Sequence, residues 1–587
     1  MVNLITDNID VWTSAHKPKS NRGRGRGAGS SNQNPQGIKK LRELILELAF
    51  RGKLAPQNPT DEPASVLLEK IAKEKVDLIK QGKIKKQKPL PEITEDEKPF
   101  KQPDGWEWVR LGKFCEIKGG KRLPKGHTFS TVKTPYIYIR VTNMKEGSIT
   151  QDGHKYISRE TQKEISRYTI SKNDLYITIA GTIGDVGIVP ECFDGMNLTE
   201  NAAKIIFDRV EKIWFQKALS SLTMQRQFAE KTNQLAQPKL ALHRVASSCI
   251  ALPPLAEQHR IVAKVDELMA LCDKLEQQQM GSIAAHKILV ETLLATLNDA
   301  ADHTDLTAAW KRVANHFDTL FTTEHSIDQL KQTILQLAVM GKLVPQDPKD
   351  EPAGDLLEKI AKEQTRLIKT GKIKKQKPLP EITDNEKPFE LPLGWKWARP
   401  DDFSQKITDG EHFRPQTQDV GVYFLSAKDI RSDGISLEDP LYISEQTAEI
   451  ALQRCNPETG DLLIVSRGAT VGRMCTVDIS VVFCLLGSVI LIKPQQPMLS
   501  DYLKIVMKTP QAFKKLVSAS GSTAQPAIYL RDLKKIIFPI APLKEQYRII
   551  AKVDELMALC DQLNARLNEA QTTQIQLADA IDEKAVA

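Results

Sequence analysis

An internal duplication with a period near 289 residues constrains this chain of 587 residues more than any other feature. Residues 38–108 align without a gap on residues 327–397, and 48 of the 71 aligned positions are identical. A second match pairs residues 254–275 with residues 542–563. The period is far longer than the roughly 20–50 residues of solenoid repeats, so each copy is a unit of domain size.

Between the matching flanks lie two inserts whose sequences have diverged, residues 109–251 and residues 398–540. Both are 143 residues long, and short echoes such as AGTIGDVG and RGATVGR indicate one shared fold. Matching flanks around unlike inserts favour two copies of one partner-binding frame that carry two different ligand sites. Drift after duplication is the alternative, but drift alone would not spare the flanks.

The flanks are predicted to be helical. Segments 40–53 and 65–82 each place apolar residues on one face and contain a terminal glycine. In 255–275 and its copy the apolar residues are spaced 4, 3, 4, 3, which predicts a heptad seam that needs a helical partner. The seam residues are Ile261, Val265, Leu268, Cys272 and Leu275 in the first copy and Ile549, Val553, Leu556, Cys560 and Leu563 in the second. We expect the two seams to pack antiparallel on each other, with packing on local helices as the alternative.

The inserts are predicted to be mixed α/β, because they contain short stretches rich in β-branched and aromatic residues as well as helical segments. The predicted fold class is α+β, with two mixed α/β domains related by a pseudo-twofold and joined by long helices that form an antiparallel coiled-coil-like spacer. The predicted parts are a basic disordered tail (1–37), a helical region (38–108), the first insert domain (109–251), a central helical spacer with the repeated helical region (252–397), the second insert domain (398–540) and a C-terminal helical region (541–587).

Positive charge is concentrated in two parts of the chain. The net charge is +8, and residues 11–42 carry eight Lys or Arg and no acid. The first insert has 22 basic and 13 acidic residues, whereas the second has 16 of each. A basic tail and a basic domain within an otherwise acidic frame suggest a polyanion such as nucleic acid as the partner.

Several classes of protein lack support in this sequence. No C-x-x-C pair occurs among the eight cysteines, and no uninterrupted apolar run approaches the ~18 residues of a membrane span. The N-terminus lacks a secretion pattern, so we expect a cytoplasmic protein without membrane insertion. There is no P-loop, no dinucleotide fingerprint, no H-E-x-x-H and no metal spacing among the histidines, so we expect no catalytic residue and no metal. A weak nuclease-like pattern of Asp104, Glu116 and Lys118 keeps a self-contained nuclease or methyltransferase as the alternative.

The layout resembles the specificity subunit of type I restriction-modification enzymes. The resemblance rests on GIKKLRELILELAFRGKL before the first insert, on LPPLAEQHRIVAKVDELMALCDKLE and its copy, and on the insert openings IKGGKRLPKG and ITDGEHFRPQ. It implies that the inserts are two target-recognition domains on a helical spacer, reading a bipartite double-stranded DNA target. It also implies docking of two modification subunits and, through them, restriction subunits. S-adenosylmethionine, ATP and Mg would then belong to those partners, with no cofactor in this chain.

Base identity in DNA is read mainly in the major groove by Arg, Lys, Asn and Gln side chains. The candidates for DNA contact are therefore polar and basic residues expected in exposed loops of the two inserts. They are Lys121, Arg122, Lys125, Arg140, Asn143 and Lys145 in the first insert and His412, Arg414, Lys428, Arg431, Arg467 and Arg473 in the second. Because half or more of such contacts go to the DNA backbone, each candidate is as consistent with a phosphate contact as with base reading.

Overall fold

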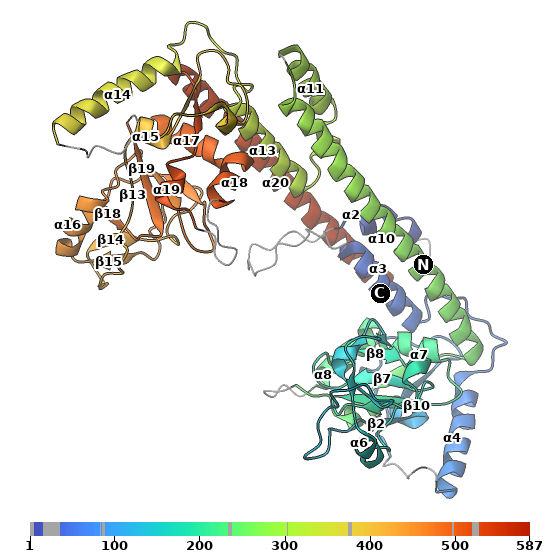
Figure 1. Ribbon diagram of the computed structural model, residues 1–587. Coiled ribbons are helices and arrows are strands. Elements are labelled where there is room, and N and C mark those ends of the chain that lie inside the picture. Colours follow the sequence, from blue (N-terminus) through green and yellow to red (C-terminus); the bar gives the residue numbers. More distant parts are fainter. Residues whose placement is uncertain are drawn as a thin grey trace. The chain divides into compact units, whose positions relative to one another are not determined.

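The structure of the chain is a computed structural model that describes residues 5–15, 36–82, 84, 89–232, 238–301, 303–371, 373, 379–495, 498–518 and 527–586. The chain folds into two compact units, Met1–Ser282 with Glu569–Ala587, and Ile283–Asn568. Both units mix helices and strands (Figure 1), and the strand orders of their larger sheets correspond. The long helices α10 (Leu255–Asn298) and α20 (Leu543–Val586) each contribute one end to each unit.

The frame of the first unit is built on α3 (Gln36–Phe50), whose apolar face is buried. This helix runs antiparallel to α10, because Arg42 pairs with Asp273 at 2.7 Å while Asp61, beyond the end of α3, pairs with Arg260 at 2.6 Å. The last turn of α20 lies at the other end of α3, where the Arg51 guanidinium donates to the Val586 carbonyl at 3.1 Å. A cation at this position satisfies a carbonyl that has no partner within its own helix.

The frame of the second unit repeats this arrangement around α13 (Glu324–Val339). Lys331 pairs with Asp561 of α20 at 2.6 Å, and Asp350 pairs with Arg548 at 2.6 Å. Lys342 donates to the carbonyls of Asn298 and Ala300 at the end of α10, at 2.7 and 2.9 Å. In each unit, therefore, one short helix packs between the start of one long helix and the end of the other.

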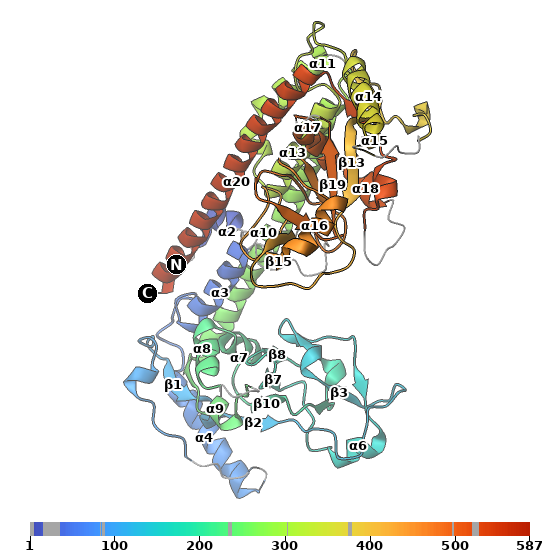
Figure 2. The ribbon, with the colours of Figure 1, turned by 90° about the vertical axis from the view of Figure 1, so that its left-hand side faces the viewer.

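The first insert contains a four-stranded antiparallel sheet in the order β2-β10-β7-β8 and a three-stranded sheet in the order β6-β3-β9, which Figure 2 shows with α6 beside the main sheet. Its elements are β2 (Cys115–Gly119), β3 (Ile137–Ile139), β4 (Met144–Lys145), β5 (Ser148–Ile149), β6 (Lys155–Tyr156), α6 (Arg159–Glu164), β7 (Leu175–Thr178), β8 (Val186–Ile188), β9 (Asn197–Leu198), β10 (Ala202–Phe207), α7 (Lys212–Leu219), α8 (Leu222–Glu230) and α9 (Leu242–Ala246).

The second insert has the same two sheets, ordered β13-β19-β16-β17 and β15-β14-β18. Its elements are α15 (Pro400–Phe403), β13 (Ser404–Asp409), β14 (Val422–Leu425), β15 (Leu441–Ile443), α16 (Glu445–Arg454), β16 (Leu462–Val465), β17 (Met474–Thr476), β18 (Phe483–Leu485), β19 (Val489–Pro494), α17 (Met498–Lys508), α18 (Pro510–Ser518) and α19 (Leu530–Leu533). The first insert also contains α5 (Leu111–Phe114), and the remaining helices flank the inserts: α4 (Ala64–Lys80), α11 (His303–Asn315), α12 (Phe317–Leu320) and α14 (Ala353–Lys369). The fold class is thus α+β with two repeated domains joined through long helices.

The expected partner of the heptad seams is wrong. In the first unit Ile261, Val265, Leu268 and Cys272 share a core with the apolar face of α3 and with Ala578 and Ile581 of α20. The second seam likewise shares a core with α13 and with Val290, Leu294 and Leu297 at the end of α10. Each seam therefore packs on the duplicated helix before its insert, as in the alternative left open above, and also on the far end of the other long helix, but not on the other seam.

The predicted disordered tail is wrong for residues 5–15, which include helix α2 (Ile9–Ser14). Ile5 and Trp12 are buried against α3, and the Gly37 amide donates to the Ala15 carbonyl at 2.9 Å. A Cβ on Gly37 would lie 2.1 Å from the Trp12 carbonyl oxygen, so only glycine allows this approach. Residues 1–4 and 16–35, which contain the Arg-Gly stretch, lie outside the described residues.

The helix α10 is long and apolar enough to be compared with a membrane-spanning helix, which the search for uninterrupted apolar runs did not indicate. By length and composition it could cross a membrane, since one 18-residue window has a mean hydropathy of 1.2. Its Val290, Leu294 and Leu297 are instead buried in the core of the second unit. Only 17% of this window is buried within the structure, and a single helix of this kind is weak evidence for a membrane.

Candidate nucleic-acid interface

Each insert is joined to its frame through a two-stranded antiparallel ribbon, which we call the neck. The first neck pairs β1 (Glu107–Arg110) with β11 (Cys249–Leu252), and the second pairs β12 (Lys396–Ala398) with β20 (Phe538–Ile540). The sequence-derived ends of the inserts fall on these ribbons. Both ends of an insert therefore leave the frame at one place, which is the geometry of an exchangeable domain.

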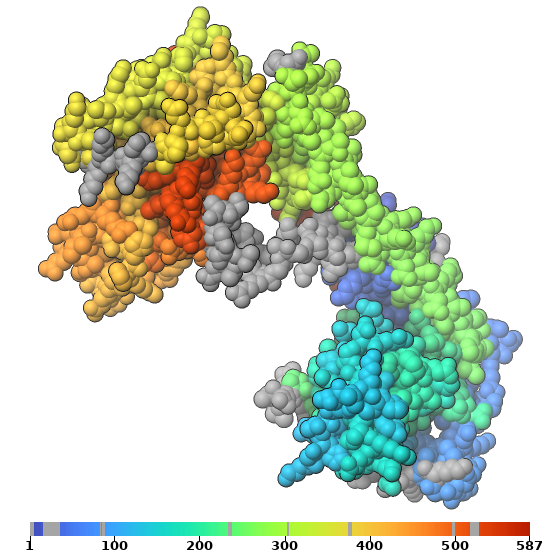
Figure 3. Space-filling model, in the orientation of Figure 1, coloured from blue at the N-terminus to red at the C-terminus, as the bar shows by residue number. Residues whose placement is uncertain are grey.

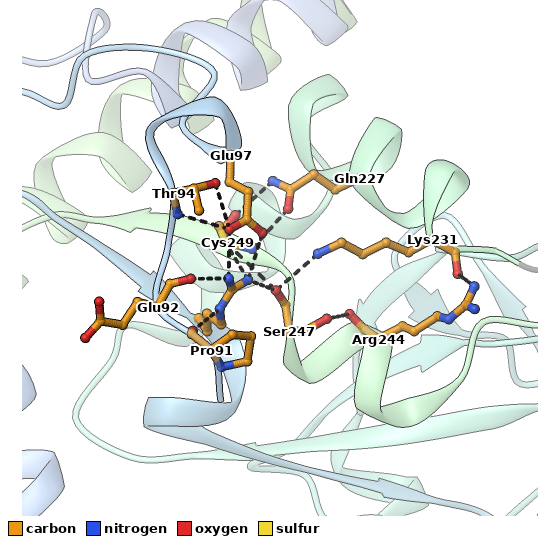
Figure 4. Close-up of polar contacts among 10 residues, drawn as sticks. Pro91, Glu92, Thr94, Glu97, Gln227, Lys231, Arg244, Ser247 and Cys249 are labelled. Atoms are coloured by element: carbon orange, nitrogen blue, oxygen red, sulfur yellow. Dashed lines mark hydrogen bonds and ion pairs between the residues drawn. The ribbon is translucent and has the colours of Figure 1, made fainter. Parts of the chain in front are cut away.

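The buried Arg110 fastens the first neck to the chain that precedes it. Figure 4 shows Pro91, Glu92, Glu97 and Ser247, whose atoms Arg110 contacts, gathered at this place. Its guanidinium donates to the carbonyls of Pro91 and Glu92 at 2.7 Å each and to the Ser247 carbonyl at 2.6 Å. It also pairs with the Glu97 carboxylate at 2.8 Å, and this hydrogen bond holds the pKa of Glu97 below its usual value. The clamp connects the preceding segment, the first strand of the neck and the end of the insert.

The second copy repeats this clamp with fewer contacts. Arg399 pairs with Glu386 at 2.9 Å and donates to the Lys535 carbonyl, while its Nε has no partner within the described residues. Neither arginine was among the residues predicted from the sequence, although they occupy the same position in two inserts that have largely diverged. That coincidence is the signal by which they could have been found.

A buried carboxylate at the start of each long helix completes the frame. The Trp106 indole N–H donates to Glu257 at 2.9 Å, and Trp395 donates to Glu545 at 3.0 Å. Burial raises the pKa of Glu257 to about 6 and raises the pKa of Glu545 in the same direction. Frame contacts are thus repeated nearly unchanged on either side of inserts that have diverged.

In the first insert, the entry loop after β2 holds three of the candidate residues, and all three are exposed. Lys121 lies 5.7 Å from the centroid of the Tyr168 ring, and Arg122 pairs with Glu200 at 3.1 Å. Lys125 and the more distant Lys145 have no ion pair within the part of the chain that the structure describes. In Figure 3 the cyan segment that includes this loop forms much of the visible face of its domain.

The other two candidates of this insert have structural contacts. Arg140 is partly buried and donates to the Gly153 carbonyl at 3.0 Å. Asn143 is only 2% exposed, and its amide accepts from the Arg140 amide and donates to the Asp152 carbonyl. The prediction that Asn143 contacts DNA gains no support from the structure, because its side chain is buried and is hydrogen-bonded inside its own turn.

In the second insert, three candidates already have a carboxylate partner: Lys428 pairs with Asp439, Arg431 with Glu438, and His412 with Asp409. Arg473 donates to a backbone carbonyl at 3.3 Å. Arg414 and Arg467 are exposed and form no ion pair with the described residues. These two arginines keep donors available for an anion.

Three further observations concern metal binding, the nuclease-like pattern and the glycine-rich segments. Among the described residues there is no group of three or more His, Cys, Asp or Glu that could hold a metal ion. In the weak nuclease-like pattern, Glu116 pairs with Lys118 of its own strand at 2.7 Å. The glycine-rich echoes are the hairpin loops after β7 and β16, where Gly181, Gly184, Gly468 and Gly472 have positive φ.

A family model described as the type I restriction modification DNA specificity domain matches residues 103–284 and 419–571. The chain belongs to this family. It is 39% identical over 617 residues to the type I restriction enzyme EcoAI specificity subunit of Escherichia coli, covering 99% of both chains. It is 37% identical over 604 residues to the EcoEI specificity subunit of the same species, again covering 99% of both. A crystal structure of the HsdS subunit from Thermoanaerobacter tengcongensis is 21% identical, with a TM-score of 0.39, and the match covers 84% of this chain and 98% of that one.

Family membership confirms the resemblance drawn from the sequence, and it makes the inserts target-recognition domains of a type I specificity subunit. The first match begins shortly before the first neck, the second begins within the second insert, and both continue into the long helix that follows. The first match therefore covers both strands of its neck, whereas the second covers only β20 of its neck.

Proposed function

We propose that the chain is the non-catalytic DNA-recognition subunit of a type I restriction-modification complex and that it reads a bipartite target. The first recognition domain reads one half-site, the second reads the other, and the base pairs between them are not read. The observation that carries this proposal is the pair of necks, through which one duplicated frame presents two domains of unlike surface. With this architecture the recognised DNA sequence can change while the frame that holds the recognition domains stays the same.

The duplicated frame supports two equivalent docking partners, which we propose to be two modification subunits, with restriction subunits attached through them. The ion pairs Asp61–Arg260 and Asp350–Arg548 have the same length, 2.6 Å, so this contact of the frame with its long helix is repeated in both units. Binding of S-adenosylmethionine, ATP and Mg²⁺ would then belong to the partner subunits. The proposed location is the cytoplasm, where the DNA and these partners are, without insertion into a membrane.

An exchange of recognition domains tests the proposal. Residues 398–540 are replaced, between the strands of the second neck, by the corresponding segment of the EcoAI specificity subunit, and the complex with modification subunits is expressed in cells. Sequencing of modified bases should show one half-site changed and the other kept. A change in both half-sites, or in neither, would contradict the modular assignment.

A second measurement addresses catalysis. The purified chain without partners should neither cleave DNA nor transfer methyl groups from S-adenosylmethionine, and adding the modification subunits should restore methylation. Cleavage or methylation by the chain alone would instead support the alternative of a self-contained enzyme.

A further inference from the structure

The second recognition domain contains a cavity of about 460 Å³ beside the ends of β13 and β16. Its apolar floor includes Ile490 and Ile528, which are almost fully buried. Its rim carries Arg467, from the hairpin loop after β16, with Tyr529 and Arg531 from the start of α19. Of these, only Arg467 was among the residues singled out from the sequence.

The two arginines of the rim share one aromatic ring. The guanidinium carbon of Arg467 lies 6.0 Å from the centroid of the Tyr529 ring, and that of Arg531 lies 5.6 Å from it. Contact with an aromatic face restricts the positions of a guanidinium group, and it leaves the N–H donors of that group free for hydrogen bonds. Arg467 has no ion pair within the described residues, so its donors remain available. The ring of Tyr529 limits their positions before any ligand binds.

Among the described residues that line this cavity the one acid is Asp409, and it does not neutralise the rim. Its carboxylate is mostly buried, and it pairs with Arg454 at 2.7 Å and lies 3.5 Å from His412. Arg531 lies 3.5 Å from the carboxylate of its neighbour Asp532, whereas Arg467 has no such partner among the described residues. The rim therefore presents the cation of Arg467, the partly paired cation of Arg531 and an aromatic face toward the opening. This combination suits a nucleotide, which carries a phosphate and a flat base with acceptors on its edge.

The same place in the first recognition domain has different chemistry. Isolated strand bridges join Ala180 to Lys239 in the first domain and Arg467 to Ala527 in the second, so these pairs occupy equivalent positions. Counting onward from these bridges, Tyr529 corresponds to Ala241 and Arg531 to His243. Two arginines and a tyrosine thus replace two alanines and a histidine, although the backbone around them is shared. A site that reads a different base sequence is expected to diverge in this way, whereas the frame contacts do not.

We propose that this cavity reads one base pair of the second half-site, with Arg467 donating to the acceptors of a guanine edge. Tyr529 orients Arg467, and Arg531, whose side chain is 78% exposed, holds a neighbouring phosphate. The inference deepens the proposed function and rests on it. Arg467 thereby becomes a specificity-determining residue, and Tyr529 a positioning residue.

The test uses the full chain in complex with its modification subunits and a randomised library of DNA targets whose methylation is scored by sequencing. Arg467→Ala should lower discrimination at one base pair of the second half-site by roughly 5- to 150-fold, the range for removal of a bidentate arginine–guanine pair. Arg467→Lys should do nearly the same while keeping the charge, because lysine lacks the two-pronged donor. The first half-site should remain as selective as before.

The roles of the other two residues have separate readouts. Tyr529→Leu should resemble Arg467→Ala, whereas Tyr529→Phe, which keeps the ring, should resemble the wild type. Arg531→Ala should weaken binding to all sequences and reduce the slope of log affinity against log salt by about 0.9, the value for one neutralised phosphate. His243→Ala, at the equivalent position of the first domain, is the matched control and should leave the second half-site unchanged.

Two results would overturn the inference: full discrimination in the Arg467→Ala and Arg467→Lys complexes, or an equal loss of affinity for every sequence. Retained selectivity at the first half-site shows that the variant complex is folded and assembled. A wild-type complex without a bipartite preference would refute the proposed function itself. A bipartite wild type with an unaffected Arg467→Ala variant would refute only the assignment of this cavity.

Discussion

Replacing the arginine of each neck clamp by methionine should destabilise the two units to different extents. Arg110 donates to three backbone carbonyls and to Glu97, whereas Arg399 donates to one carbonyl and to Glu386. Methionine keeps most of the side-chain volume but removes every donor. The comparison therefore isolates the hydrogen bonds, because the two sites share one backbone arrangement.

The expected magnitude follows from the number of hydrogen bonds that each substitution removes. Hydrogen bonds from a charged donor contribute about 1.5 kcal/mol each at the low end of their range, and an ion pair with a partly exposed carboxylate adds under about 1 kcal/mol. Arg110→Met should then cost about 5 kcal/mol and Arg399→Met about 2 kcal/mol. For a cooperative unit of about 300 residues, with an unfolding entropy of about 2 cal/mol/K per residue, these values correspond to falls in Tm of about 8 and 3 °C.

Scanning calorimetry of the full chain provides the assay, with the two single variants and the double variant compared with the wild type. Each variant should lower the transition of its own unit and leave the other in place. An equal or larger effect of Arg399→Met, or an Arg110→Met transition within 1 °C of the wild type, would refute the reasoning that the carbonyl contacts stabilise the neck.

Three further outcomes are expected. Leu268→Asp, which places a carboxyl in the core shared with α3, should cost several kcal/mol and lower the Tm of the first unit, and an unchanged Tm would argue against a buried seam. Burial raises the pKa of Glu257 to about 6, so the folded state binds this proton more tightly than the unfolded state. The resulting contribution to the free energy of unfolding, about 2 kcal/mol, is present below the unfolded pKa near 4.5 and is lost as the pH rises through 6. In thermal melts at a series of pH values, Glu257→Gln should remove this component of the pH dependence. The triple variant with Lys121, Arg122 and Lys125 replaced by alanine should weaken binding to specific and unrelated DNA alike. The slope of log affinity against log salt should become shallower by about 0.9 for each phosphate that is no longer neutralised. An unchanged slope would mean that the entry loop faces away from the duplex.

The sequence predicted the helices of the frame well because their apolar residues repeat at helical spacing over many turns. The segments 40–53 and 65–82 correspond to α3 and α4, each within a few residues. The heptad spacing also located the buried face of α10. It could not identify the partner of that face, because a seam specifies only that an apolar helix must cover it, and α3 with the end of α20 met this condition as well as the second seam did.

The candidate site was harder to predict, because residue type does not report burial. Asn143 has a side chain suited to reading adenine, but a tight turn uses both ends of its amide. Trp12 was assigned to a disordered tail, because a single aromatic residue in a short polar segment gives no periodic signal. Tyr529 was missed for a related reason: its importance comes from two arginines that lie near its ring only after folding, one of them 62 positions away in the sequence.

The chemistry of the first clamp explains how an insert can diverge while its joint with the frame persists. Three of the acceptors that Arg110 uses are backbone carbonyls, which every residue supplies whatever its side chain. Substitution at Ser247, on the insert side, therefore leaves the acceptor in place so long as the backbone keeps its course. The neck strands add backbone ladder hydrogen bonds that are equally independent of sequence. A joint made of main-chain contacts and one constant arginine places little restriction on the residues beyond it, so the two recognition surfaces were able to change separately.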